Sequence, residues 1–282
     1  ALKSSDHITA WDLREEMWSG KGGRVTVPTG LMALDRILGG GIGLGELSVI
    51  GAHTSPAQTA DSYQITLNMA LTDSNVSVGY SPVEGSPSRM FDRMVASRAG
   101  FTRRWLMRSG EATAQHREVY DRAADEVGLA PLHFPPADRV PRTASGIAAW
   151  ITSKARSEGI KVFFIDHIDD VDLERSPGDS TATAYREALR RLQNTAAREN
   201  VAIVYLSQVN DRQKTTEMPS MHSLRESGAK EELAQLVLML FLDYRETSQQ
   251  SATAHLGAPA RPLWARVDKQ TEGEVGDVWG PM

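Results

Sequence analysis

The sequence predicts an α/β protein with a mostly parallel, twisted sheet flanked by helices. Short apolar runs alternate along the chain with longer stretches whose apolar residues recur every three or four positions, as in amphipathic helices. The apolar runs are continuous, which is typical of strands covered on both faces. Together these patterns indicate βαβ units, and in such sheets ligands bind beyond the carboxyl ends of the strands.

The elements follow one another in a regular order. Six runs are predicted as strands: 46–50, 76–80, 161–166, 201–207, 236–242 and 262–268. Helices are predicted over 58–72, 86–99, 113–127, 144–158 and 182–199. The stretch 247–261 is polar and rich in small residues, so it predicts a mobile loop between two late strands.

The N-terminal residues 1–23 are predicted to be a helix and a flexible linker, ahead of one domain over 24–282. The helix spans 6–18 and has Trp11 and Trp18 on one side, and the linker reads SGKGG. So short a helix does not stabilise itself. We therefore expect it to dock, either on its own domain or on a neighbouring subunit.

Composition narrows the functional classes. The 282 residues are 40% apolar and 24% charged, with a net charge of −5 and no cysteine. Disulfides, thiolate nucleophiles and cysteine-based zinc sites are thereby excluded. The acidic balance means that a nucleic-acid contact needs a local basic patch. No apolar stretch approaches the roughly 18 residues that span a bilayer, and no signal peptide is recognisable, so a cytoplasmic location is expected.

The segment GAHTSPAQTA (51–60) follows a strand and precedes a helix, as a phosphate-binding loop does. In such loops glycine N–H groups cradle phosphates, a lysine neutralises them, and a Ser or Thr hydroxyl ligates magnesium. Thr59 retains the hydroxyl, but Gln58 carries no charge and Pro56 has no N–H to donate. Loss of a buried charge-assisted contact to a polyphosphate costs about 2–5 kcal/mol.

Five other segments of the chain indicate which family of phosphate loops this segment should be compared with. They read VPTGLMALDRILGGGIGLGEL, KVFFID, SQVN, LRESG and VDKQTEG, in that order. This combination resembles the RecA-like motor domain of the DnaB family of replicative DNA helicases, over about residues 24–280. The resemblance implies a RecA-like P-loop NTPase fold, ATP and Mg²⁺ as ligands, a ring or hexamer, and DNA as partner. No counterpart of the family's primase-engaging N-terminal domain is present, which would suit a phage or mobile element.

The resemblance also assigns catalytic roles. Glu84 aligns with the glutamate that positions the attacking water, Asp166 with the acidic residue that steers magnesium, and Gln208 with the γ-phosphate sensor. Each has an alternative: Glu84 as a surface carboxylate, Asp166 as a helix cap, and Gln208 as a bridge between loop backbones. Lys269 aligns with a lysine that acts on a neighbouring subunit's nucleotide, and Thr271 stands where relatives place an arginine finger.

Two cationic contributions are therefore absent together, at positions 58 and 271. An arginine finger alone is worth about 10³ to 10⁵ in rate. We expect weak ATP and Mg²⁺ binding and absent or very slow hydrolysis. The nucleotide-binding candidates are Ser55, Ala57, Gln58, Thr59 and Lys269, and the metal ligands Thr59 and Asp166.

The resemblance places DNA contacts in the LRESG stretch and the loop before it. An arginine offers a charged fork and a glycine permits close backbone approach. In the alternative, Arg225 and Glu226 form a local ion pair at a helix start. The DNA-facing candidates are Arg212, Lys214, Arg225, Glu226 and Gly228, with Arg175 nearby.

Four functions stay open at this point. The first is a DNA-binding, DnaB-like protein of replication or recombination with impaired hydrolysis. The second is a competent helicase that recruits a substitute cation, such as Arg89 or a neighbour's Lys269. The third is a metal-dependent, structure-specific nuclease that uses the carboxylates of 165–174. A contiguous run of carboxylates usually forms a solvated loop, which argues against this function. His167 within the run is expected to be a polar loop residue. The fourth is a non-catalytic subunit that assembles with an intact helicase.

Overall fold

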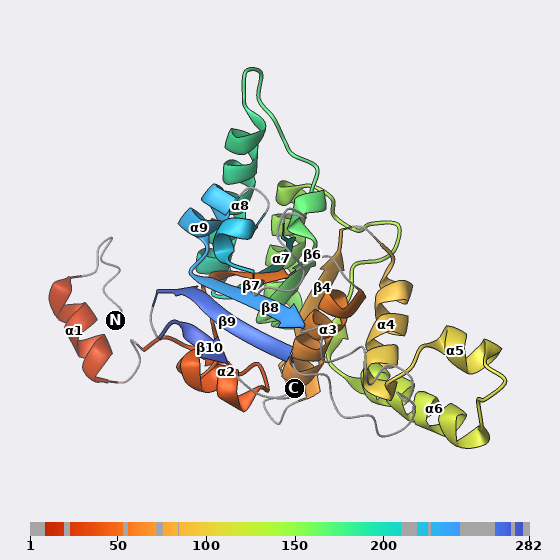
Figure 1. The fold of residues 1–282 in the computed structure, drawn as a ribbon. Coiled ribbons are helices and arrows are strands. Elements are labelled where there is room, and N and C mark those ends of the chain that lie inside the picture. Colours follow the sequence, from red (N-terminus) through yellow and green to blue (C-terminus); the bar gives the residue numbers. More distant parts are fainter. Residues whose placement is uncertain are drawn as a thin grey trace.

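The fold is that of a computed structural model, which describes residues 9–19, 23–52, 56–71, 76–83, 85–209, 219–224, 227–242, 263–271 and 274–278. A central sheet dominates the described part of the chain (Figure 1). Its eight strands lie in the order β10 (Gly276–Val278), β9 (Leu263–Gln270), β8 (Leu236–Leu242), β3 (Leu47–Ala52), β7 (Ala202–Gln208), β6 (Val162–Asp166), β4 (Val78–Pro82) and β5 (Leu132–His133).

Strands β8 to β5 of this order run parallel, and β9 and β10 add an antiparallel edge. A separate antiparallel pair joins β1 (Thr26–Val27) to β2 (Ile42–Gly43) ahead of the first core strand. The predicted α/β class with a mostly parallel sheet is therefore confirmed.

The helices begin and end where capping residues allow. They are α1 (Ala10–Trp18), α2 (Met32–Ile37), α3 (Pro56–Leu71), α4 (Pro87–Ala99), α5 (Arg103–Arg108), α6 (Ala114–Leu129), α7 (Ala144–Glu158), α8 (Thr181–Glu199) and α9 (Ser227–Leu233), with the short 3₁₀ helices η1 (Ile168–Asp170) and η2 (Met221–Ser223). Thr143 caps α7 and Ser180 caps α8, because each side chain accepts a backbone N–H of the first turn. Gly159 and Asn200 end the same helices in the left-handed region, with φ of 68° and 48°.

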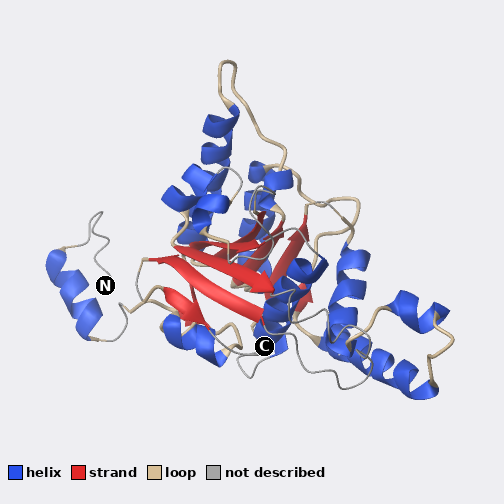
Figure 2. Ribbon diagram, viewed as in Figure 1, coloured by secondary structure: helices blue, strands red, loops and turns tan. Residues whose placement is uncertain are grey.

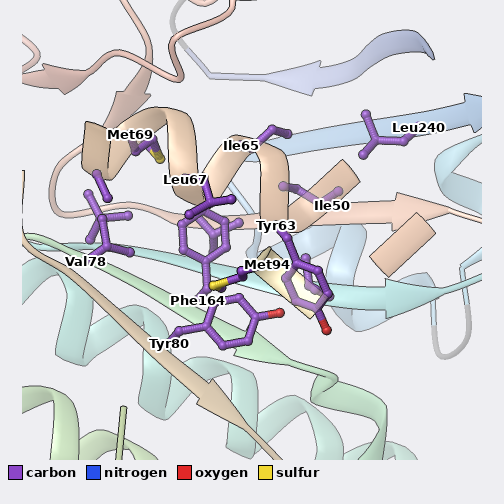
Figure 3. Packing of buried hydrophobic residues seen from close by; sticks show 14 of the residues in the cluster. Ile50, Tyr63, Ile65, Leu67, Met69, Val78, Tyr80, Met94, Phe164 and Leu240 are labelled. Atoms are coloured by element: carbon purple, nitrogen blue, oxygen red, sulfur yellow. The ribbon is translucent and has the colours of Figure 1, made fainter. Parts of the chain in front are cut away.

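Helices cover both faces of the sheet (Figure 2). Helices α3, α4 and α6 pack on one face, and α7, α8 and α9 on the other. Successive residues of β6 alternate between them: Phe164 joins the first core and Phe163 the second. In the first core Tyr80 stacks on Phe164, with ring centroids 6.0 Å apart and planes 14° from parallel, beside Tyr63 and Leu67 of α3 (Figure 3). The strands are thus buried on both sides, as their continuous apolar character requires.

All six predicted strands occur, shifted by a few residues, and α7 has the predicted bounds. The helix after β3 begins at Pro56 rather than at 58, which places the Ala57–Thr59 segment inside its first turn. The short elements α2, α5, α9, β1, β2, β5 and β10 were not predicted. The segment 247–261, predicted as a mobile loop, lies outside the described residues.

Helix α1 lies apart from the sheet in Figure 1. Trp11 is 62% exposed and Trp18 is 80% exposed. The Arg14 guanidinium covers the Trp11 ring at 4.7 Å from its centroid, a cation–π contact at the surface. The tryptophan side predicted for this helix is therefore available to a neighbour.

Candidate functional site

Four parallel strands, β3, β7, β4 and β6, end at the same edge of the sheet. Two predicted site residues, Asp166 and Gln208, lie at this edge. Ala52 of β3 pairs with Gln208 of β7, and Pro82 of β4 pairs with Asp166 of β6. The Val83 N–H, which lies one residue before Glu84, donates to the Asp166 carbonyl at 2.6 Å. Chain segments far apart in sequence thus converge where ligands bind in open α/β sheets.

The phosphate-loop candidates lie at the beginning of α3. Its first residue, Pro56, comes four positions after the end of β3. Backbone N–H groups at a helix N-terminus and the helix dipole favour an anion there. Ala57, Gln58 and Thr59 form the first turn, while Ser55 and Glu84 lie outside the described residues.

Asp166 ends β6 with its side chain buried. The Tyr80 hydroxyl donates to Oδ2 at 2.8 Å, and His167 Nδ1 lies 2.9 Å from Oδ1. The helix-cap alternative is wrong, because His167 occupies the N-cap of η1 and no side chain makes a capping bond there. Carboxylate oxygens are the ligand type that a hard cation such as Mg²⁺ takes.

His167 is held among carboxylates rather than lying in solvent. Its Nδ1 is 2.9 Å from Asp166 Oδ1 and 3.8 Å from Asp170 Oδ2. Burial alone would lower the pKa of His167, but contact with Asp166 and the charges of Asp166, Asp170 and Asp169 outweigh it and raise that pKa. His167 lies in the turn after β6, as expected of a loop residue, but its ring faces carboxylates.

A buried polar cluster, Asp169, Lys230, Ser207 and Tyr185, lies behind this edge. Lys230 is fully buried, and its Nζ donates to Asp169 Oδ1 at 2.6 Å and to Ser207 Oγ at 2.5 Å. Asp169 Oδ2 accepts the Ser207 hydroxyl and the Gln208 N–H, both at 3.0 Å. Tyr185 OH completes the set at 3.2 Å from Asp169 Oδ1. One carboxylate therefore ties η1, the end of β7, α8 and α9 together.

Sequence reasoning missed this cluster. Its one local signal is a lysine three residues before Leu233, on the apolar side of a short helix. Its partner Asp169 lies 61 positions away in the chain. Asp169 was grouped instead with carboxylates expected to be solvated.

A further cation near Asp166 was also missed. Arg93 of α4 donates from Nη1 to the Tyr63 hydroxyl at 3.4 Å. The Tyr63 hydrogen bond, and more weakly the charge of Asp166, raise the pKa of Arg93 against the opposing effect of burial. Arg93 lies one helical turn after Arg89 on α4. It is close enough to Asp166 for the charge of that carboxylate to act on it.

The candidates for trans action lie at the opposite edge. Lys269 pairs with Val237 at the beginning of β8, and its Nζ donates to the Glu231 carbonyl at 2.5 Å. Thr271 donates from N and Oγ1 to the Gln235 carbonyl, at 3.1 and 3.3 Å. This edge lies at the amino ends of the parallel strands, away from Asp166. Lys269 therefore does not lie beside Asp166 and Gln208 in this chain.

Part of the segment predicted to face DNA is described. Val209 and Leu224 form an antiparallel bridge. Gly228 is exposed in α9, where an added Cβ would meet nothing within 4 Å, so the fold itself does not require glycine there. Arg175 is exposed in the segment before α8 that projects at the top of Figure 1. The remaining DNA candidates, Arg212, Lys214, Arg225 and Glu226, lie outside the described residues.

The carboxylates of 165–174 do not converge on one point. Asp169 is neutralised by Lys230, and Glu174 is bonded to Ser145 through N–H at 3.0 Å and through the hydroxyl. Within the described residues, no group of three or more His, Asp or Glu side chains is placed to hold a metal ion. The run is also not the solvated loop that was expected, because Asp166 and Asp169 are turned inward.

No helix in the described ranges is long and apolar enough to cross a membrane.

Comparisons with known proteins match this chain to DnaB-like helicases. The family model of the DnaB-like helicase C-terminal domain matches residues 26–279. The replicative DNA helicase DnaB of Treponema pallidum (strain Nichols) is 29% identical over 257 residues, which are 90% of this chain and 53% of that helicase. The chain spans about half the length of the curated relatives it matches, from 49% to 58%.

Two solved structures share the fold. The ATPase domain of G40P superposes with a TM-score of 0.74 at 20% identity, over 94% of this chain and 90% of that one. A DnaB-like replicative helicase, solved in a study of its interactions with primase, gives a TM-score of 0.77 at 19% identity, over 97% of this chain and 65% of that one. The predicted RecA-like fold and the family resemblance are both confirmed.

Proposed function

The chain belongs to the family of DnaB-like helicase C-terminal domains, and we propose that it acts as a DNA-binding ring component in replication or recombination whose ATP hydrolysis is absent or very slow. DNA is the expected partner, through Arg212, Lys214, Arg225, Glu226 and Gly228. ATP with Mg²⁺ is the expected but weakly held ligand. Glu84 and Gln208 retain the residue types that hydrolysis needs.

The position of Gln58 at the beginning of α3 is the main support for impaired hydrolysis. It lies in the first turn of α3, directly beyond β3 and on the edge where Asp166 and Gln208 also end their strands. A glutamine there leaves the β and γ phosphates without the cation that this position supplies in a phosphate loop. Thr271 supplies no charge from the other side, and both its donors are engaged with Gln235.

The residue types expected to hold Mg²⁺ are present. Asp166 places a buried carboxylate at the end of β6, and Thr59 is part of the first turn of α3. Bound Mg²⁺ would bridge phosphate oxygens and offset their charge. Weak binding of the nucleotide with an intact metal ligand is therefore the expected combination.

Ring assembly is the second part of the proposal. The exposed Trp11 and Trp18 of α1 suit docking on a neighbouring copy or on an intact helicase. Lys269 lies at the edge opposite its own nucleotide site, as a trans-acting residue must. A homogeneous hexamer in solution supports self-assembly, and a stable monomer that joins only an intact helicase supports the non-catalytic subunit.

One observation favours a second candidate, a competent motor with a substitute cation. Arg93 lies within electrostatic reach of Asp166 and contacts Tyr63 of α3. It stands on the same helix as Arg89. A guanidinium on α4 that turns toward the nucleotide would replace part of the missing charge.

Nucleotide calorimetry with and without Mg²⁺, followed by steady-state hydrolysis with and without single-stranded DNA, separates these candidates. We expect weak binding and hydrolysis near background. Gln58→Lys alone should not restore brisk turnover, whereas Gln58→Lys with Thr271→Arg should exceed either single change, because each supplies one of the two missing cations. Recovery by Gln58→Lys alone would show that the role given to Thr271 is wrong. Brisk wild-type hydrolysis that Arg93→Ala abolishes would establish the second candidate.

A further inference from the structure

A cleft of about 690 Å³ lies between α7 and α8, on the face of the sheet opposite α3. Arg156 of α7 and Arg190, Arg191 and Arg198 of α8 line it, and Glu187 is the one acidic residue of its lining. We call it the arginine cleft. Its positive lining is unexpected in a chain whose net charge is −5.

Two arginines of the arginine cleft, Arg156 and Arg198, are held in a fixed arrangement by Glu199. Arg156 donates from Nε and Nη2 to both carboxylate oxygens of Glu199, at 2.7 and 2.8 Å. Arg198 donates from Nε to Glu199 at 2.8 Å and from Nη2 to Thr152 Oγ1 at 3.1 Å. The Glu199 side chain is 5% exposed, but those of Arg156 and Arg198 are 66% and 56% exposed. The carboxylate is therefore covered, while both guanidiniums still face the solvent.

The charges do not cancel. The lining itself holds four arginines and one glutamate, while Glu199, Glu232 and Glu174 lie near its arginines from outside the lining. Arg190 forms an ion pair with Glu187 at 3.1 Å and a longer one with Glu232 at 4.0 Å. Exposed pairs of this kind are weak, so a ligand with higher charge density competes for the arginine. A concave positive surface concentrates anions from solution.

The spacing of the arginines suits a linear polyanion. Arg190, Arg191 and Arg198 line the cleft from the same helix. At about 1.5 Å of rise per residue they span about 10–12 Å along the axis. One strand of duplex DNA carries a phosphate about every 3.4 Å of its axis, so about three phosphates cover that length.

The rest of the lining argues against a protein segment. Ala148 and Ala149 are its apolar members, and the lining contains no aromatic residue. Protein interfaces depend on large apolar or aromatic anchors, and single-strand binding modules depend on aromatic stacking. Polar and cationic side chains without either feature are typical of sequence-independent backbone contacts.

We propose that the arginine cleft is a second nucleic-acid contact, which binds the phosphate backbone of DNA on the outside of the domain. Its lining runs from Ala148 to Arg156 of α7 and from Glu187 to Arg198 of α8, on the face of the sheet opposite α3. The contact is sequence-independent and needs no nucleotide. It is separate from the LRESG segment, and either surface can be lost without the other.

The test compares two double variants of the full chain. Arg190→Ala with Arg191→Ala removes two charges from the cleft and spares the Arg156–Glu199–Arg198 group. The matched control, Arg103→Ala with Arg104→Ala, removes two adjacent exposed arginines from α5. Binding of a fluorescent single strand and of a duplex is followed by anisotropy over a range of salt concentrations. Thermal unfolding checks that both variants fold.

We expect the cleft variant to lose on the order of tenfold in affinity at low salt, through two charge-assisted contacts. The slope of log K against log salt should fall by about 1.4–1.8, at 0.7–0.9 per phosphate contact. The α5 control should keep the wild-type slope. Equal slopes in the two double variants would overturn the proposal.

Other outcomes are also decisive. If Arg225→Ala abolishes DNA binding while the cleft variant binds like wild type, the proposed function stands and the arginine cleft is not a DNA site. Displacement of the duplex by polyglutamate at equal charge, with weaker competition from unlabelled DNA, would identify an acidic protein partner instead. A changed oligomeric state of the cleft variant in light scattering would make the cleft an interface between copies and overturn the proposal.

Discussion

The Lys230–Asp169 pair and the Arg156–Glu199 pair have nearly the same length, 2.6 and 2.7 Å, but opposite surroundings. Lys230 is fully buried and Asp169 is 5% exposed, whereas Arg156 is 66% exposed above a covered Glu199. In the first pair both charges are satisfied inside the protein. In the second, one charge serves to orient another that still faces the solvent. The difference separates charges that hold the fold from charges that are available to a ligand.

The buried pair holds the site together from behind. Asp169 bonds the Gln208 N–H and, through Lys230, α9, so it fixes both ends of the segment that runs from β7 to α9. The exposed pair has no such task, because α7 and α8 already pack through their apolar faces. Loss of the two pairs should therefore have very different consequences.

The largest expected effect is that of Lys230→Met. It leaves the Asp169 carboxylate buried without its cation, which should cost about 3–5 kcal/mol in the free energy of unfolding, measured by urea denaturation. The double variant Lys230→Met with Asp169→Asn should regain part of that loss, because no charge is left buried. A Lys230→Met protein as stable as wild type would remove the distinction between the two pairs.

Tyr80→Phe should have the next largest effect. Its hydroxyl is the donor to Asp166 Oδ2 at 2.8 Å, and its removal leaves a buried acceptor without a partner. We expect a loss of about 1–3 kcal/mol in urea denaturation. Val78, on the same strand, offers a contrast, because Val78→Ala removes packing without touching Asp166. An unchanged stability of Tyr80→Phe would mean that water replaces the donor.

Glu199→Gln should have a smaller, pH-dependent effect. Hydrogen bonds from Arg156 and then Arg198 lower the pKa of Glu199 to about 2. Because the pKa in the folded state is below the unfolded value of about 4.3, this stabilisation is present above about pH 4.3 and is lost as the pH falls through the folded pKa. Thermal midpoints of wild type and Glu199→Gln should therefore converge as the pH is lowered from about 5 to 2. A constant difference would show that the arginines do not set this pKa.

The smallest effect is expected at a fully surface pair. Arg122 and Glu118 lie one turn apart on α6, 3.0 Å from each other, and each side chain is 72% exposed. Arg122→Ala should change the free energy of unfolding by no more than about 0.5 kcal/mol. A loss above about 1 kcal/mol in urea denaturation would contradict the rule that exposure sets the value of a pair in this protein.

Much of the fold could be predicted because it depends on local patterns. Continuous apolar runs located the core strands, and three- and four-residue spacing located α7 and α8. Sequence patterns do not predict the short α5 or the two-residue β1, β2 and β5. A segment of six residues or fewer is too short to show a periodic apolar pattern. Tertiary contacts, rather than local propensity, hold such pieces.

The candidate site was predictable where strand ends mark it. Asp166 and Gln208 close apolar runs, so the sheet brings them to one edge. Lys230 and Arg93 were not predictable, because their partners lie 61 and 30 positions away in the chain. The roles of Gln58 and Thr271 stay predictions until hydrolysis is measured.

Gly51 lies in β3, one residue before the strand ends. A Cβ built there would collide with Leu224 and would lie 2.8 Å from the Met239 thioether. Leu224 is the last described residue before the LRESG arginine, and β3 leads into the phosphate loop. A methyl group at position 51 would thus push Leu224 away from β3, so the absence of a side chain there sets how closely the segments predicted to face DNA and nucleotide can pack.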